Sequence, residues 1–171
     1  DWVAFKGNMP TVPVTDMVIH PREHDLVAAT YGRGLFVTNV AWLAEAKEGV
    51  LQKDAHLFAI RPRAVPREGP WGNFELYGDR HLIVPNDDGV NVDFFLRSKP
   101  AEKVKVAIAD GAGATVRTIE AEGRAGLNRV TWDVTAGRGR RLGPGVYGVT
   151  VEAGGQTLAG TARVVPEGHP R

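Results

Sequence analysis

Hydrophobic and polar residues alternate along the second half of the chain. Apolar residues occupy every second position from Val90 to Leu96. The same period returns at residues 104–108, 128–134, 147–151 and 158–164. A period of two is that of a half-buried β-strand. Glycine-rich turn sequences separate these segments, so the pattern predicts an antiparallel β-sandwich.

The first forty residues predict a smaller set of strands. Short apolar runs at residues 2–6, 14–20, 26–30 and 34–39 are separated by Pro, Asn, Asp and Gly. A sheet of this size is marginal without partners, because it buries too little apolar area to form its own core. We therefore expect these strands to pair or pack with neighbouring sheets.

The stretch between the two sets of strands has a different pattern. The segment from Val40 to Val50 has apolar residues at helical spacing, which predicts one short amphipathic helix whose end is marked by Gly49. Four prolines between residues 52 and 85 then exclude long regular elements. The expected fold class is all-β. The expected units are terminal strands and helix at 1–50, an extended Pro-rich connector at 51–88, a sandwich at 89–166 and a tail at 167–171.

Composition and charge narrow the function classes. The formal net charge is +1, which gives no overall field for nucleic acid or an anionic membrane. The chain has no cysteine, so thiol nucleophiles, disulfides and thiolate metal sites are excluded. No apolar run is long enough to span a bilayer. No serine lies near a histidine in a pattern that suggests a catalytic triad, and His20 and His24 fall on a Pro-containing turn. We expect no enzyme activity and no cofactor.

Three aromatic residues form one candidate ligand site. Trp71, Phe74 and Tyr77 follow one another at intervals of three in the irregular connector. Such a group could stack on sugar rings. Aromatic residues on a connector also fill the seam between domains, since each buries about 150–250 Å². Both interpretations stay open from the sequence.

Two polar clusters are further candidates. Arg138, Arg140 and Arg141 alternate with glycine in a loop that could bind a polyanion or an acidic partner, or could only keep the loop solvated. Asp87, Asn91 and Asp93 lie in the segment richest in oxygen ligands, where Ca²⁺ is one interpretation. A tight turn entering a strand explains the same residues without a metal.

Two motifs near the N-terminus resemble a known family. The run from Leu26 to Val37, with Thr30-Tyr31-Gly32-Arg33-Gly34 at its centre, follows Val18-Ile19-His20-Pro21. This arrangement resembles the closing blade of sortilin-like or BNR (Asp-box) β-propellers. The Asp-box motif itself is absent, although Asp1-Trp2 resembles its last two positions. The resemblance implies that the chain begins within a blade. The start Asp1-Trp2-Val3 is neither an initiator methionine nor a signal peptide, so we expect the true N-terminus to lie elsewhere.

The second half resembles the FlgD-type Ig-like domain. The resemblance is carried by Val104 to Asp110, by Gly126-Leu127-Asn128-Arg129-Val130-Thr131-Trp132-Asp133 and by Pro144-Gly145-Val146-Tyr147. These motifs are folding signatures and bring no catalytic residue with them. Any glycosidase activity of the wider family would reside in propeller blades that this chain does not contain.

The two resemblances together imply a structural or protein-interaction role. The chain would be the C-terminal region of an exported propeller protein, located in the periplasm, at the cell surface or outside the cell. Its expected partner is the upstream propeller of the same polypeptide or a separate subunit that supplies the missing blades. The alternative is an accessory carbohydrate-binding module of a glycoside-active propeller, with Trp71, Phe74 and Tyr77 contacting glycan.

Overall fold

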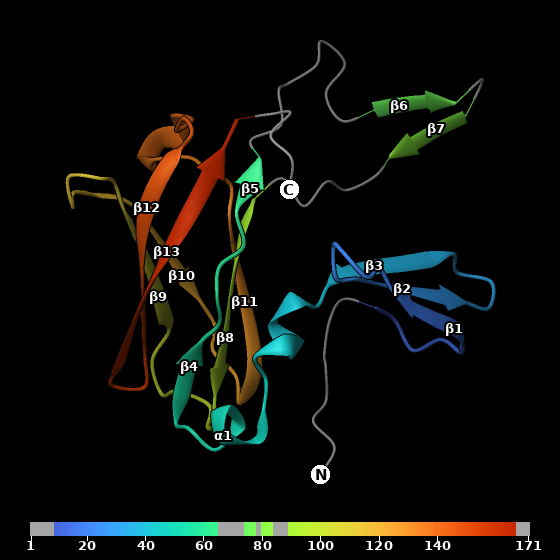
Figure 1. The fold of residues 1–171 in the computed structure, drawn as a ribbon, viewed down its shortest axis with the longest axis horizontal. Helices are drawn as coiled ribbons and strands as arrows, with labels where there is room; N and C mark the ends of the chain where they lie inside the picture. The colour runs from blue at the N-terminus through green and yellow to red at the C-terminus, as the bar shows by residue number, and fades with distance from the viewer. Residues whose placement is uncertain (1–8, 65–73, 78–79, 84–88, 167–171) are drawn as a thin grey trace.

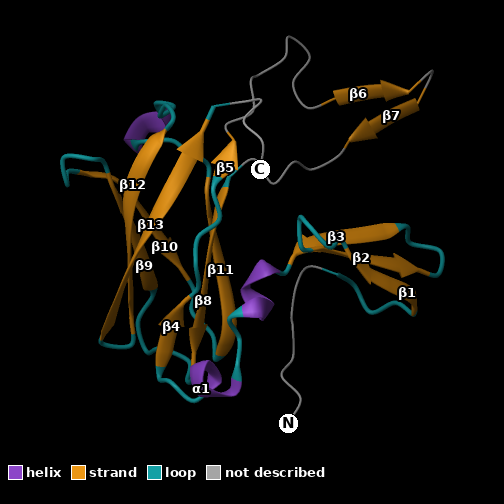
Figure 2. Ribbon diagram, in the orientation of Figure 1, coloured by secondary structure: helices purple, strands orange, loops and turns teal. Residues whose placement is uncertain are grey.

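The computed structural model describes residues 9–64, 74–77, 80–83 and 89–166. The first part of the described chain contains the strands β1 (Val14–Ile19), β2 (Asp25–Thr30) and β3 (Leu35–Asn39), the 3₁₀ turn η1 (Ala41–Ala44), the helix α1 (Glu48–Leu51), and the strands β4 (Ala55–Leu57) and β5 (Arg63–Ala64). The second part contains β6 (Phe74–Tyr77), β7 (Arg80–Ile83), β8 (Val90–Leu96), β9 (Val104–Ala109), β10 (Thr115–Ala121), β11 (Gly126–Trp132), the 3₁₀ turn η2 (Gly137–Gly139), β12 (Gly145–Ala153) and β13 (Gln156–Val165). Strands dominate and the helical turns are short (Figure 2), so the predicted all-β fold is confirmed.

The second half of the chain forms a β-sandwich. One sheet has the strand order β10-β9-β12-β13-β5, and the facing sheet has the order β11-β8-β4. Figure 1 shows the two sheets stacked face to face, with β8 and β11 behind β12 and β13. All pairings within these sheets are antiparallel except that of β13 with β5, which is parallel.

The space between the two sheets holds the main hydrophobic core. The alternating residues predicted to share a face are the ones that the sandwich buries. The largest fully buried side chains include Trp132, Phe94 and Ile108. The strand that the sequence predicts from Asn128 to Trp132 therefore contributes core side chains, as the motif implies.

One buried polar residue closes the loop before β11. Asn128 is the buried polar side chain among the described residues, with 7% exposure. Its amide donates to the carbonyl oxygens of Arg124 and Gly126 at 2.8 and 3.0 Å, and its Oδ1 accepts from the backbone N–H of Arg124 at 3.0 Å. Burial of the amide is tolerated because its donors and acceptor are all paired with backbone groups.

The segment predicted as an irregular connector contributes two edge strands. Residues Ala55–Leu57 pair with β8, and Arg63–Ala64 pair with the end of β13. These strands are three and two residues long, which is too short for a period of two to be read from the sequence. Pro62 precedes β5 directly, and an edge position tolerates such a neighbour because only one side of the strand is paired.

The predicted single helix is replaced by two separate helical turns. The 3₁₀ turn η1 ends at Ala44, and α1 begins at Glu48 after the extended residue Lys47. Neither N-cap position makes a side-chain capping hydrogen bond, and Gly49 lies inside α1 rather than at its end. A short uncapped helix containing glycine is marginal, so packing of Trp42 on the sandwich decides the local geometry.

The described residues 14–39 form a sheet of their own. Strands β1, β2 and β3 make an antiparallel sheet in that order. Figure 1 shows this sheet beside the sandwich, connected to it through η1. The strands predicted at 14–20, 26–30 and 34–39 are confirmed, and the one predicted at 2–6 lies outside the described residues.

Candidate interaction surface

One face of the sheet β1–β3 has an open apolar centre, with Asp16 opposite Ala29 and the pair of Asp25 with Asn39 on the same face. Directly paired residues of an antiparallel sheet share a face, and the register places Val18 opposite Val27 and Val27 opposite Val37. Ala29 and Leu35, paired two residues further along, share that face. We call these residues (Val18, Val27, Ala29, Leu35 and Val37) the valine face. Val18, Leu35 and Val37 are 60%, 68% and 63% exposed, so this face lacks the cover that apolar sheet faces normally have.

The opposite face of this sheet is partly covered. Met17 and Ile19 are 64% and 47% exposed on it. Met17 lies opposite Ala28, which is buried and pairs in turn with the half-buried Phe36, and Ile19 lies opposite the half-buried Leu26. Both faces of the sheet therefore carry exposed apolar side chains, although the valine face carries more.

The edges of this sheet are also open within the described part of the chain. Strand β1 pairs with β2 alone, and β3 pairs with β2 alone. All six residues of β1 are exposed. An edge strand with free backbone groups and apolar side chains is a template for pairing with another strand.

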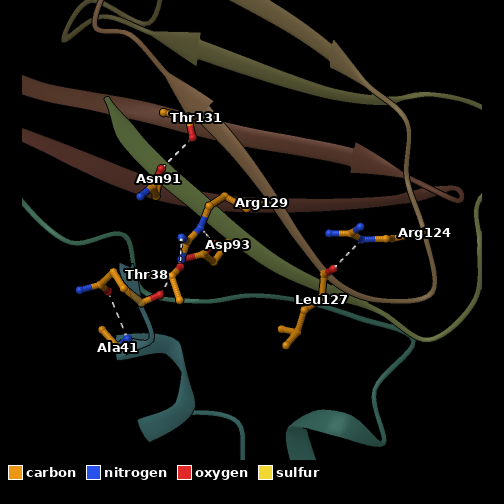
Figure 3. Close-up of polar contacts among 9 residues, drawn as sticks. Thr38, Ala41, Asn91, Asp93, Arg124, Leu127, Arg129 and Thr131 are labelled. Carbon is orange, nitrogen blue, oxygen red and sulfur yellow. Dashed lines mark hydrogen bonds and ion pairs between the residues drawn. The ribbon is translucent and has the colours of Figure 1, made fainter. Parts of the chain in front are cut away.

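Arg129 links this sheet to the sandwich. It lies on the outer face of β11, directly opposite Asp93 of β8. Its Nε and Nη2 donate to Oδ1 and Oδ2 of Asp93 at 2.6 and 2.9 Å, which is a bidentate ion pair. Nη1 also donates to Oγ1 of Thr38 at 3.2 Å, and Nη2 to the backbone oxygen of Asn39 at 2.8 Å. Figure 3 shows the guanidinium of Arg129 between Asp93 and Thr38.

The end of β3 that meets Arg129 is itself fixed. The Asn39 side chain donates to the Glu23 carbonyl and to Oδ1 of Asp25, both at 2.8 Å, and accepts from the Ala41 N–H at 3.1 Å. Arg61, in the segment between β4 and β5, also donates to the Glu23 carbonyl. Two arginines outside the sheet thus bind main-chain carbonyls at the same end of it.

An aromatic cluster supports this junction. Trp42 of η1 packs against Phe58, with ring centroids 5.8 Å apart, and both belong to a buried cluster with Phe95. Leu127 of β11 packs against the same cluster. The junction therefore combines charge-assisted hydrogen bonds with an apolar contact on the outer face of the sheet β11-β8-β4.

The predicted aromatic site is only partly described. Trp71 lies outside the described residues. Phe74 and Tyr77 are the first and last residues of β6, which pairs with β7. Sugar binding by these three residues stays a prediction.

The predicted basic loop connects β11 to β12. Arg138 lies within η2, and Arg140 and Arg141 are exposed. Arg141 forms a β-bridge with Thr135 through its backbone, and the Arg140 carbonyl accepts from Ala136 at 2.7 Å. The loop is held by its main chain, and its affinity for polyanions stays a prediction.

The predicted calcium ligands have protein partners where they are described. Asp87 lies outside the described residues. Asp93 is paired with Arg129, and Oδ1 of Asn91 accepts from Oγ1 of Thr131 at 2.8 Å. Across the described ranges, no group of three or more His, Asp or Glu residues is arranged to hold a metal ion. The calcium interpretation stays a prediction, and an arginine competes for one of its ligands.

Sequence reasoning missed the role of Arg129. Its outward position in a strand was readable, because Asn128, Val130 and Trp132 take the inward positions. Its partner was not readable, since Asp93 is 36 residues away and the pairing of β8 with β11 comes from the topology.

Comparisons with known proteins bear on the sandwich. Residues 85–157 match the family model described as FlgD Ig-like domain. The match covers less than half of the chain, and the matched family is a domain type without enzymatic activity. The resemblance to this domain type is thus supported for the sandwich.

Two solved structures are also similar. FlgD from P. aeruginosa shares 24% identity with a TM-score of 0.36, over 46% of this chain and 64% of that one. PorZ from Porphyromonas gingivalis, described as an essential bacterial surface component of the type-IX secretion system, shares 16% identity with a TM-score of 0.38, over 90% of this chain and 23% of that one. The chain thus spans less than two thirds of either protein. No curated protein matches the sequence. These matches give no support for a propeller of the sortilin or BNR type. No helix among the described residues is long and apolar enough to cross a membrane.

Proposed function

We propose that this chain is a non-catalytic protein-interaction region, in which the sheet β1–β3 docks on β-propeller blades and the sandwich supports it. The blades belong to the upstream part of the same exported polypeptide or to a separate subunit. The observation that carries this proposal is the valine face, on which Val18, Leu35 and Val37 are all at least 60% exposed.

The physical argument is the cost of leaving this face in water. Burial of apolar surface stabilises a protein by about 25 cal/mol per Å². The exposed Val and Leu side chains that lie together on this small sheet do not gain that stabilisation while they are in water. A neighbouring blade would cover the face, and a further strand in the same sheet would pair with the open edge of β1 or β3. The blade-like sequence around Thr30-Tyr31-Gly32-Arg33-Gly34 supports a blade as the occupant.

The sandwich supports the non-catalytic part of the proposal. Its match to an Ig-like domain type concerns residues that form the core, such as Trp132 and Tyr147. An exported location is part of the same proposal. The sugar-binding alternative stays a prediction, since Trp71 lies outside the described residues.

Site-specific photo-crosslinking in the source cells would test the docking. A photoreactive residue at Leu35 should crosslink to a propeller blade, whereas one at Thr118, on an exposed position of β10, should not. Native mass spectrometry of the source protein gives the length of the polypeptide and any subunit bound to it. The proposal fails if the protein is a monomer of this chain alone and amides of residues 14–39 are protected from exchange in it.

A further inference from the structure

We infer that Arg129 is an orientation lock, which holds the sheet β1–β3 at one fixed angle to the sandwich. The inference rests on the junction geometry and is independent of what covers the valine face. Arg129 is the described side chain of the sandwich that donates hydrogen bonds to strand β3.

The lock begins with the ion pair. Asp93 accepts from Nε and Nη2, so the planar guanidinium is fixed in the plane of the carboxylate. The side chains of Arg129 and Asp93 are 25% and 17% exposed, so solvent screens the pair only in part. The arginine is therefore oriented by the sandwich, before any contact with β3 is considered.

The remaining N–H groups then face β3. An arginine has five N–H donors in a rigid fork, and the pair with Asp93 leaves Nη1 and a second hydrogen of Nη2. Nη1 reaches the hydroxyl of Thr38, and Nη2 reaches the carbonyl of Asn39. These two acceptors are adjacent in the chain, so the fork contacts the strand at two points and resists rotation about either one.

The position of these contacts makes them effective. Asn39 is the last residue of β3, and the chain enters η1 at Ala41. Only Val40 lies between them, so the covalent connection alone would let the sheet swing about this residue. Val40 donates its N–H to the His24 carbonyl at 2.8 Å, which keeps it attached to the sheet. On the sandwich side of Val40, the Ala41 N–H donates to Oδ1 of Asn39 at 3.1 Å and the Leu43 N–H donates to the Val40 carbonyl at 2.9 Å. These bonds join only neighbouring residues, so Arg129 adds the contact that reaches β3 from the body of the sandwich.

The apolar contact cannot replace the lock. Trp42 packs on Phe58 and Phe95, but it lies in η1, on the sandwich side of Val40. It fixes η1 on the sandwich and restrains the sheet only through the local hydrogen bonds on either side of Val40. Arg61 adds a second contact to the sheet, at the Glu23 carbonyl, so loss of Arg129 should loosen the orientation rather than release the sheet completely.

Replacement of Arg129 by lysine would not preserve this geometry. The ammonium of lysine is a point charge on a flexible stem and cannot form a planar fork. Arg129→Lys keeps the charge opposite Asp93, so the sandwich should still fold. Arg129→Gln removes both the charge and the fork.

Spin-label distance measurements on the 171-residue chain test the lock. The chain has no cysteine, so Arg33→Cys on the β2–β3 turn and Thr161→Cys on β13 create two unique label sites, both exposed. The parent chain should give one narrow distance distribution for this pair. Arg129→Lys and Arg129→Gln should broaden it and shift its mean.

Two controls separate the lock from general loosening. The pair Thr118→Cys and Thr161→Cys lies within one sheet of the sandwich and should give the same distribution in every variant. Arg97→Gln removes an arginine that contacts Asp54 and the Lys53 carbonyl within the sandwich, and it should leave both distributions unchanged.

The lock is overturned if the distance distribution between the labels at positions 33 and 161 is as narrow in Arg129→Lys as in the parent chain. If Arg129→Gln fails to fold, Arg129→Lys alone decides. An equal broadening in Arg97→Gln would also overturn the inference, because any lost arginine would then have the same effect.

Discussion

Trp132 of β11 and Tyr147 of β12 meet edge to face across the two sheets of the sandwich. Their ring centroids are 5.0 Å apart, and the planes are inclined by 69°. Each ring also bonds to the loop that joins the two strands. Trp132 Nε1 donates to the Thr135 carbonyl at 2.9 Å, and the Tyr147 hydroxyl donates to the Gly143 carbonyl at 2.7 Å. The pair thus fixes the distance between the sheets and both ends of the loop.

Removing the hydroxyl of Tyr147 tests the loop contact separately from the packing. In Tyr147→Phe the ring still fills its place, but the Gly143 carbonyl loses its donor. We expect the free energy of unfolding to fall by about 1 kcal/mol, as measured by urea denaturation. Trp132→Ala should cost about 3–5 kcal/mol, because it leaves a cavity in the core. Val146→Ala, at a position 58% exposed, is the control and should change stability by less than about 0.5 kcal/mol. Equal losses in Tyr147→Phe and Val146→Ala would show that the hydroxyl bond contributes nothing.

Gly89 is a position where a side chain has no room. A Cβ atom there would lie 2.6 Å from the Trp132 carbonyl oxygen and 2.5 Å from Cγ2 of Thr131. The carbonyl belongs to a strand and cannot move aside, so Gly89→Ala should destabilise the sandwich by about 1–3 kcal/mol through overpacking. Gly111→Ala is the matched control, because a Cβ atom at that residue would have no other atom within 4 Å. Thermal melting of the two variants under one set of conditions provides the measurement, and a Gly89→Ala melting curve that overlays that of Gly111→Ala would contradict the clash.

Asn128 should be sensitive to substitution despite its small size. Asn128→Ala leaves the carbonyls of Arg124 and Gly126 and the N–H of Arg124 without their side-chain partners. These bonds are only partly buried, so water can pair some of the freed groups, and we expect a total loss of about 1–3 kcal/mol and faster amide exchange at Arg124. Thr118→Ala, at an exposed site on the neighbouring sheet, serves as the comparison. Unchanged exchange at Arg124 would mean that the loop is held by other contacts.

The valine face should bind a hydrophobic dye. The parent chain should enhance the fluorescence of anilinonaphthalene sulfonate, and the double variant Leu35→Lys with Val37→Lys should reduce it while the melting temperature of the sandwich stays the same. Both residues are more than 60% exposed, so the charges remain in water and do not disturb the core. Val146→Lys changes an isolated exposed residue and should leave dye binding as it was. If the double variant binds as much dye as the parent, the face is not an accessible apolar surface.

The sequence predicted the parts of the fold that repeat a simple period. Strands β9 and β12 alternate because one face of each is buried in the sandwich, and β8 does so up to Phe94, after which Phe95 is also buried, in the outer aromatic cluster. Strands β4 and β5 could not be predicted, because two or three residues carry no period. Their place is set by which sheet edges remain free after the longer strands have paired.

The open surface could be predicted better than the junction. Apolar residues on a sheet too small to bury them were visible in the first forty residues of the sequence. The link between Arg129 and β3 depends instead on residues about ninety positions apart. A single sequence does not show such a pairing, because nothing in the sequence around Thr38 and Asn39 indicates a contact with Arg129.

The pairs on the outer face of β8 and β11 have a consequence for strand alignment. Thr131 lies opposite Asn91, Arg129 opposite Asp93 and Leu127 opposite Phe95. If β11 slipped by one residue against β8, Arg129 would turn into the core away from Asp93, and Val130 and Trp132 would turn outward. Both faces of this strand pair therefore favour one register. Misaligned forms lose hydrophobic burial on the inner face and side-chain pairing on the outer face.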